Sequence, residues 1–210
     1  MLGLPQSTEV NRPLPKAQIY KKFELKQEQR DAFDNDIARL NIVHLISPQT
    51  IPAVTEGAVV KAIFVVDVEL KHSDYDTKNI ALISKLIPQR IVFALRYGDK
   101  VQLAVFHTKL FVTPWQLLTT NSSLLTIKGL NLDAVWQNIV SSIGEVEVAK
   151  GNSLTEQIKA DDERSKILRQ LENLERQMRS TSQTRHQREI YAEIKKLKNQ
   201  INGSTENAKS

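Results

Sequence analysis

The sequence predicts an α+β or α/β body with a mixed sheet of four or five strands, followed by an antiparallel pair of helices at the C-terminus. Two observations support this class. Runs rich in β-branched residues alternate with segments of helical period over residues 17–145. Beyond Gly151-Asn152-Ser153 the chain is rich in Gln, Glu, Lys and Arg and holds one aromatic residue, Tyr191. This change divides the chain into residues 1–150, a body with an extended N-terminal arm, and residues 151–210, a helical hairpin with a short disordered tail.

The composition excludes several classes of protein. The 210 residues include no cysteine, which rules out disulfides, thiolate zinc sites, iron–sulfur clusters and cysteine nucleophiles. The start of the chain lacks the apolar run of a signal peptide, and no stretch of ~18 apolar residues follows, so we expect a cytoplasmic protein without membrane association. Lysine and arginine number 29 against 24 acidic residues, and the net charge of +5 is compatible with a polyanionic partner without requiring one.

The first third of the body predicts an arm, a helix and a strand. Residues 1–22 contain three prolines, and proline favours extended backbone before it, so we expect an arm rather than a helix. Residues 24–39 repeat apolar side chains at steps of three and four or their sums, which is typical of an amphipathic helix. Residues 41–46 are rich in β-branched side chains and end at Ser47-Pro48, which predicts a strand followed by a stop.

The central segment predicts the middle of the sheet. Residues 59–71 are the most β-prone run in the chain. The following residues, 77–86, repeat apolar side chains at helical spacing, with Asp76 placed to cap the helix and Pro88 placed to end it. A strand, a helix and then another strand are therefore expected in succession.

The last part of the body predicts a hairpin and a helix. Residues 90–97 and 100–107 alternate around Gly98-Asp99, and a two-residue turn beginning with glycine is a good signal for a β-hairpin. Residues 130–143 carry a wide apolar stripe and are followed by Gly144, which predicts a helix packed on the sheet.

The C-terminal segment predicts two helices, at about 155–179 and 184–202. Each carries one narrow apolar seam with steps of 4, 3 and 4 residues, which is the spacing of paired helices. Thr184 and Gln187 have the form of a capping box, and Gly203 suits a C-terminal cap. The seams could also pair between two copies of the chain, so a homo-oligomer through the hairpin is an alternative. The seam residues are Ile167, Leu171, Leu174, Met178, Ile190, Ile194, Leu197 and Ile201.

The turn between these helices is basic. Four arginines, Arg176, Arg179, Arg185 and Arg188, lie within a stretch that has no Asp or Glu. The planar guanidinium group binds phosphate and carboxylate groups well, so the turn is a candidate surface for nucleic acid or for an acidic protein. Because no aromatic residue lies among the arginines, we expect contacts to a nucleic-acid backbone rather than stacking on bases. A solvated helix tip is the alternative interpretation.

One strand carries a pattern of charges that suggests a different function. Asp67, Glu69 and Lys71 alternate with apolar residues and therefore lie on one face of the strand. This arrangement resembles the catalytic strand of restriction-endonuclease-like nucleases, where carboxylates hold Mg²⁺ or Mn²⁺ and a lysine supports the metal-activated water. The preceding strand offers no acidic residue, and Glu56 in the connecting loop is the substitute that the sequence provides. A solvated or partner-facing surface is the alternative for these charges.

Other common chemistries find no support. The four histidines are too far apart in sequence to form a local metal-binding motif, and the seven glycines form no phosphate-binding loop. Apart from the nuclease alternative, we therefore expect no metal and no other cofactor.

The N-terminal segment carries a motif formed by Gly3, Leu4, Pro5, Ser7, Thr8, Val10, Asn11, Pro15 and Lys16. With this motif, with Glu69-Leu70-Lys71 and Ile87-Pro88, and with the closing pair of helices and its basic turn, the chain resembles a bacterial family whose domain has no assigned function. The resemblance implies a small cytoplasmic protein encoded beside helicases and DNA methyltransferases in restriction-modification or phage-defence loci.

Together these features predict an accessory, non-enzymatic subunit that docks a partner through its C-terminal hairpin. The resemblance points to a helicase or a DNA methyltransferase as that partner, and the basic turn adds DNA as another. The alternative is a divalent-metal-dependent nuclease that uses Asp67, Glu69 and Lys71.

Overall fold

The computed structural model describes residues 2–118, 124–149, 151–181 and 183–207, with Thr184 and residues 201–207 described by backbone alone. The chain divides into two compact units, residues 1–146 and 147–210. Within the described residues, no helix has both the length and the apolar character needed to cross a membrane.

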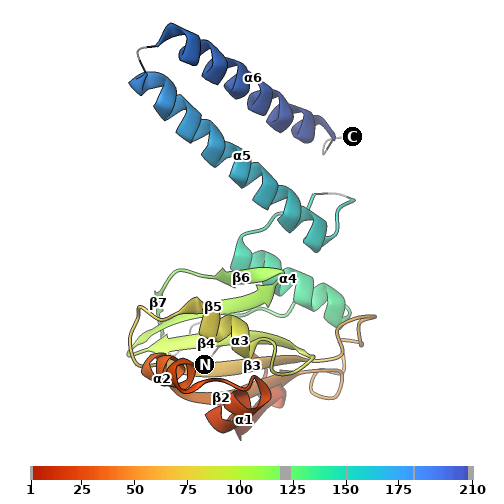
Figure 1. Ribbon diagram of the computed structural model, residues 1–210. Coiled ribbons are helices and arrows are strands. Elements are labelled where there is room, and N and C mark those ends of the chain that lie inside the picture. The colour runs from red at the N-terminus through yellow and green to blue at the C-terminus, as the bar shows by residue number, and fades with distance from the viewer. Residues whose placement is uncertain (1, 119–123, 150, 182, 208–210) are drawn as a thin grey trace. The chain divides into compact units, whose positions relative to one another are not determined.

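The first unit contains the sheet and the second contains two long helices (Figure 1). The strands are β1 (Glu9–Pro13), β2 (Ile37–Ile46), β3 (Ile63–Leu70), β4 (Arg90–Tyr97), β5 (Lys100–His107), β6 (Lys109–Val112) and β7 (Gln116–Leu117). The helices are the 3₁₀ turn η1 (Gln6–Thr8), then α1 (Lys16–Lys22), α2 (Gln27–Asp36), α3 (Thr77–Ile83), α4 (Leu132–Gly144), α5 (Leu154–Ser180) and α6 (Thr184–Asn207).

The sheet is mixed, as predicted, and in the part of the chain that the structure describes it has seven strands. Their order is β1-β2-β3-β4-β5-β6, with β7 paired to β5. The neighbours β3 and β4 are parallel, with α3 between them in sequence, and the other pairs are antiparallel. The sheet is wider than the predicted four or five strands because the N-terminal arm adds β1 and residues 109–117 add two short strands.

One face of the sheet packs against α1, α2 and α3, which lie together in front of it in Figure 1. Phe33 of α2 and Ile80 of α3 are fully buried there, together with Val66, Val68 and Phe93 from the central strands. Burial of this apolar surface is the main source of stability for the first unit.

The opposite face carries α4. Leu110 and Val112 of β6 pack into the first core, so Phe111 between them faces the other side. A Cβ atom added at Gly144, the last residue of α4, would lie 2.7 Å from the Phe111 ring, which shows how closely the helix approaches the strand. Trp136 of α4 is buried, and its indole N–H donates to His107 of β5 at 3.2 Å. The predicted apolar stripe of this helix therefore packs on the second face where β5 and β6 form it.

Two predictions for the N-terminal third are wrong. The arm is extended in β1, but Lys16–Lys22 is helical, because Pro15 suits the start of a helix and Ile19 becomes fully buried. The helix predicted over 24–39 ends at Asp36, and β2 begins at Ile37. Ile37 pairs with Leu70 of β3, so pairing with a neighbouring strand overrides a spacing that also suited a helix.

The centre of the body has the predicted strand, helix and strand, but α3 ends at Ile83, before the predicted limit at residue 86 and well before Pro88, and β3 is shorter than the predicted run 59–71. The carboxylate of Asp76 accepts a hydrogen bond from the backbone N–H of Lys78 and caps α3, as predicted. The strands β4 and β5 have the predicted limits, and Gly98 in their turn has φ +59°, a conformation that glycine adopts without strain.

Asp133 in the first turn of α4 connects this helix to the loop before β3. Its carboxylate accepts hydrogen bonds from the backbone N–H groups of Ala58 at 2.6 Å and Val60 at 2.7 Å, and from Val59 at 3.2 Å. These bonds, above all the one from Val60, hold the pKa of Asp133 below its ordinary value. A Cβ atom at Gly57 would lie 2.4 Å from the same carboxylate, so the loop approaches as closely as glycine allows.

Replacing Asp133 with asparagine is expected to lower the free energy of unfolding at pH 7 by about 1–2 kcal/mol, because charge-assisted hydrogen bonds become weaker neutral ones. A carboxylate whose pKa is lowered by folding stabilises the protein above its unfolded pKa, 3.8 here, and loses that effect as the pH falls further. The difference between wild type and Asp133→Asn in urea unfolding should therefore shrink from pH 7 to pH 3. A difference independent of pH would contradict this role.

Candidate functional site

The predicted catalytic strand is β3, and its first acidic residue, Asp67, is bound by an arginine. Arg96 of the neighbouring strand β4 donates from Nε to one carboxylate oxygen at 2.5 Å and from Nη2 to the other at 2.6 Å. The side chains are 13% exposed for Asp67 and 31% exposed for Arg96. The hydrogen bonds to Asp67 raise the pKa of Arg96 above its ordinary value. The two groups therefore form a bidentate ion pair on the sheet.

The other two residues of the predicted catalytic set lie towards the end of β3. Glu69 pairs with Arg39 of β2 at 3.4 Å, and both side chains are exposed. Lys71 follows the strand, and its backbone N–H donates to the carbonyl oxygen of Asp36 at 2.8 Å. Each carboxylate on this face thus has an arginine partner, and the nuclease alternative stays a prediction.

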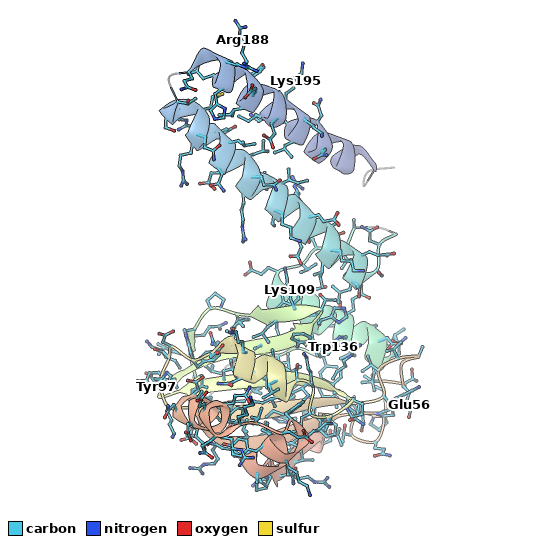
Figure 2. The ribbon with its side chains drawn as sticks, viewed as in Figure 1. Glu56, Tyr97, Lys109, Trp136, Arg188 and Lys195 are labelled. Atoms are coloured by element: carbon cyan, nitrogen blue, oxygen red, sulfur yellow. The ribbon has the colours of Figure 1, made fainter. Side chains whose placement is uncertain are left out.

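Glu56 does not come near these carboxylates. It lies in the loop that precedes β3, whereas Glu69 lies at the other end of that strand. Figure 2 shows Glu56 at one end of the sheet and Tyr97, the residue after Arg96, at the opposite end. Its nearest charged partner is Lys61, at 3.4 Å. Among the residues described, no three His, Asp or Glu side chains converge in a way that could hold a metal ion.

Asp36, which the sequence analysis did not single out, is a buried acidic residue directly before β2. Its carboxylate accepts from the backbone N–H of Asp76 at 2.9 Å and from the side-chain amide of Asn79 at 2.7 Å, and it lies 3.3 Å from Nε2 of His72. The helix predicted over residues 24–39 included Asp36, so a position beside the end of β3 was not expected for this residue. The hydrogen bonds of Asp36 connect the start of β2 to the start of α3.

The second unit is the predicted pair of helices, with seams that pack against each other. Leu171 of α5 and Ile190 and Ile194 of α6 are buried at their contact. Ile167, Leu174, Met178 and Leu197 pack around them, and Lys198 pairs with Glu175 across the helices at 3.1 Å. A second copy of the chain would have to displace these contacts in order to pair through the same seam. The side chain of Ile201 lies outside the described residues.

The caps of this unit differ in part from the predicted ones. Gly203 lies inside α6, which continues to Asn207, so its prediction as a C-terminal cap is wrong. The capping box of Thr184 lies outside the described side chains. Its predicted partner Gln187 instead donates to the carbonyl oxygen of Thr181 at 2.8 Å, across the turn. Ser153 and Glu156 form a capping box at the start of α5.

The four arginines of the turn are exposed at one end of the hairpin, which we call the tip (residues 176–191). Arg176 pairs with Glu172 at 3.6 Å and Arg185 with Glu189 at 3.4 Å, within their own helices. Such exposed pairs contribute little energy, so these guanidinium groups can exchange their partners at small cost. The three nearby glutamates, at 172, 175 and 189, make the tip a surface of mixed charge.

An open groove of about 470 Å³ lies at the tip, lined by Met178, Gln187, Arg188 and Tyr191. Figure 2 shows Arg188 projecting from α6 near the turn, with Lys195 further along the same helix. Tyr191 is 62% exposed although it is large and partly apolar. No aromatic residue lies between the four arginines in sequence, but Tyr191 follows Arg188 on α6 and lines the groove beside it. The signal was the three-residue step from Arg188 to Tyr191, which places both on one face of a helix.

Comparison with known proteins places the chain in a family. A search of curated proteins and a search of solved structures each found no match. The family described as "Domain of unknown function (DUF4391)" matches residues 2–201, which is nearly the whole chain. The match therefore includes the whole sheet, all of α5, and α6 as far as residue 201, and the chain belongs to the DUF4391 family.

Proposed function

We propose that this chain is an accessory, non-enzymatic subunit that docks a partner protein through the tip of its helical hairpin. The observation that carries the proposal is the groove of Met178, Gln187, Arg188 and Tyr191. Tyrosine, arginine and methionine are the residue types enriched in the cores of protein interfaces. An exposed tyrosine beside an arginine is also a frequent source of binding energy in such interfaces.

The charges of the tip favour a protein over nucleic acid. Glu172, Glu175 and Glu189 flank the arginines and would lie close to the phosphates of a polyanion that covered the whole tip. A partner protein can instead place an acidic side chain against Arg188 and an apolar side chain against Tyr191, because its negative charges lie at single positions and need not approach the glutamates. The hairpin seam is occupied within the chain, so the groove and its arginines are the part of this unit best suited to a partner.

The partner that we propose is a component of a bacterial nucleic-acid-processing system. The resemblance of the N-terminal motif implies neighbouring genes for a helicase and a DNA methyltransferase, as in restriction-modification or phage-defence loci. A subunit of this kind would contribute a docking surface, and the chemistry would belong to its partner.

The test is co-purification of the full-length protein with the helicase and the methyltransferase encoded beside its gene, followed by measurement of affinity. We expect the variant Arg176→Gln, Arg179→Gln, Arg185→Gln, Arg188→Gln to bind at least about tenfold more weakly. Tyr191→Ala should have an effect of similar size, because the ring supplies apolar contact rather than charge. Glutamine keeps helix propensity close to that of arginine, so the hairpin should remain folded.

A matched control removes four positive charges from the same helices away from the tip. Its substitutions are Arg164→Gln, Lys166→Gln, Arg169→Gln and Lys195→Gln, all at exposed positions. This variant should bind like wild type. Equal weakening by both sets would show a general charge effect and contradict docking at the tip. Loss of the complex on nuclease treatment would show that nucleic acid, not protein, occupies the tip.

A further inference from the structure

A cavity of about 190 Å³ lies on the sheet face opposite α1, α2 and α3. Three polar side chains, His44, Asp67 and Arg96, line it, and they come from three adjacent strands, β2, β3 and β4. The remaining lining residues are aliphatic. They are Leu2, Val43, Ala94, Val101 and Leu118.

An irregularity in β2 helps to form this cavity. Ile42 pairs with Val66 and His44 with Val65, so Val43 has no partner on β3 and the register shifts by one residue. Successive residues of a regular strand point to opposite faces, but a bulge turns two neighbours towards the same side. Both Val43 and His44 therefore line the cavity. Bulges of this kind often occur beside binding sites, where they redirect a side chain.

Thr8 of the N-terminal motif favours one tautomer of His44. The hydroxyl of Thr8 donates its single hydrogen to the carbonyl oxygen of Pro5 at 2.7 Å and lies 2.9 Å from Nδ1 of His44. With its hydrogen directed to Pro5, the hydroxyl accepts from Nδ1–H, and in the neutral ring Nε2 is then an acceptor. Burial lowers the pKa of His44, which keeps the ring neutral at pH 7. No described group bonds its Nε2.

The ion pair contributes both donors and acceptors without net charge. Arg96 uses Nε and one hydrogen of Nη2 on Asp67, which leaves the N–H groups of Nη1 as donors. The carboxylate of Asp67 keeps lone pairs beyond those used by Arg96. Since the two charges cancel and His44 is neutral, neither an anion nor a cation gains a net attraction from these three groups.

We propose that this cavity binds a small neutral single-ring heterocycle with amide-like N–H and C=O groups, as in a pyrimidine base. A volume of 190 Å³ is below the ~300 Å³ at which sites for larger organic ligands begin, and it suits a single ring. The aliphatic walls pack against the ring faces, and the donors of Arg96 and the acceptors of Asp67 and His44 meet its polar edge. This assignment is independent of docking at the hairpin tip.

The test is ligand-observed NMR and a thermal shift of the full-length protein with uracil and cytosine, at millimolar concentrations. We expect saturable binding with Kd near ~1 mM or tighter. Leu118→Trp fills the rim of the cavity and should weaken binding at least about tenfold. Leu117→Trp places the same bulk on the neighbouring residue, which is 62% exposed and outside the cavity lining, and should change binding less than about twofold.

Two comparisons separate the alternatives. Benzoate and benzylamine have similar size and opposite charge, and tighter binding of either than of uracil would overturn the assignment of a neutral ligand. A short oligothymidylate that competes with uracil would indicate a base presented by a single strand, and lack of competition would indicate a free base. No saturable binding of uracil or cytosine, or binding unchanged in Leu118→Trp, would overturn the proposal.

Discussion

Replacing Phe33 with alanine is expected to lower the free energy of unfolding of the first unit by about 3–5 kcal/mol. Phe33 has no exposed surface, and its ring packs edge-on against Tyr20 with centroids 5.7 Å apart. The substitution removes this apolar burial and leaves a cavity between α2 and the sheet. Unfolding in urea can be followed by tryptophan fluorescence, because both tryptophans of the chain, Trp115 and Trp136, belong to the first unit.

Tyr97→Ala is the control for this prediction. Tyr97 lies at the end of β4 and is 40% exposed, so its loss should cost less than about 1 kcal/mol. Similar costs for the two substitutions would mean that α2 does not pack on the sheet as the structure shows.

Replacing Arg96 with alanine is expected to cost about 2–3 kcal/mol, because it leaves the carboxylate of Asp67 largely buried without its partner. The cost is below that of a fully buried pair, since Arg96 keeps some contact with solvent. Arg39→Ala provides the comparison, because the pair of Arg39 and Glu69 is exposed and should contribute less than about 0.5 kcal/mol.

The double variant Asp67→Asn, Arg96→Gln separates charge from packing. It replaces both ions by neutral amides that can still bond to each other, so much of the loss seen in Arg96→Ala should be recovered. Its unfolding is measured in the same urea experiment. A double variant as unstable as Arg96→Ala would show that packing of the arginine stem, not the unpaired charge, causes the loss.

Local patterns were sufficient to predict the elements whose signals are short in range. The hairpin of β4 and β5 depends on alternation and on Gly98, and the long helices depend on a repeat of 4, 3 and 4 residues. The cap of α3 by Asp76 likewise involves neighbours in sequence. The energies that select these structures act within a few residues, so the sequence displays them directly.

Elements that depend on distant partners were not predictable in this way. Residues 37–40 suited a helix by spacing, but pairing with β3 makes them strand. The same holds for α1, whose Lys16 and Tyr20 both donate to Asp34 of the following helix. In each case, a long-range contact outweighs a local preference of a few tenths of a kcal/mol per residue.

The candidate sites likewise differ in whether their residues are close in sequence or meet only in the folded chain. The arginines of the tip were visible in the sequence as a cluster without Asp or Glu, and the charges of β3 were visible because alternation places them on one face. The partnership of Asp67 with Arg96, the groove beside Tyr191 and the cavity around His44 were not visible. The cavity depends on the register of four strands, on a bulge at Val43 and on a threonine from the N-terminal motif. Such features are formed by side chains that meet only when the chain folds, and no local pattern records them.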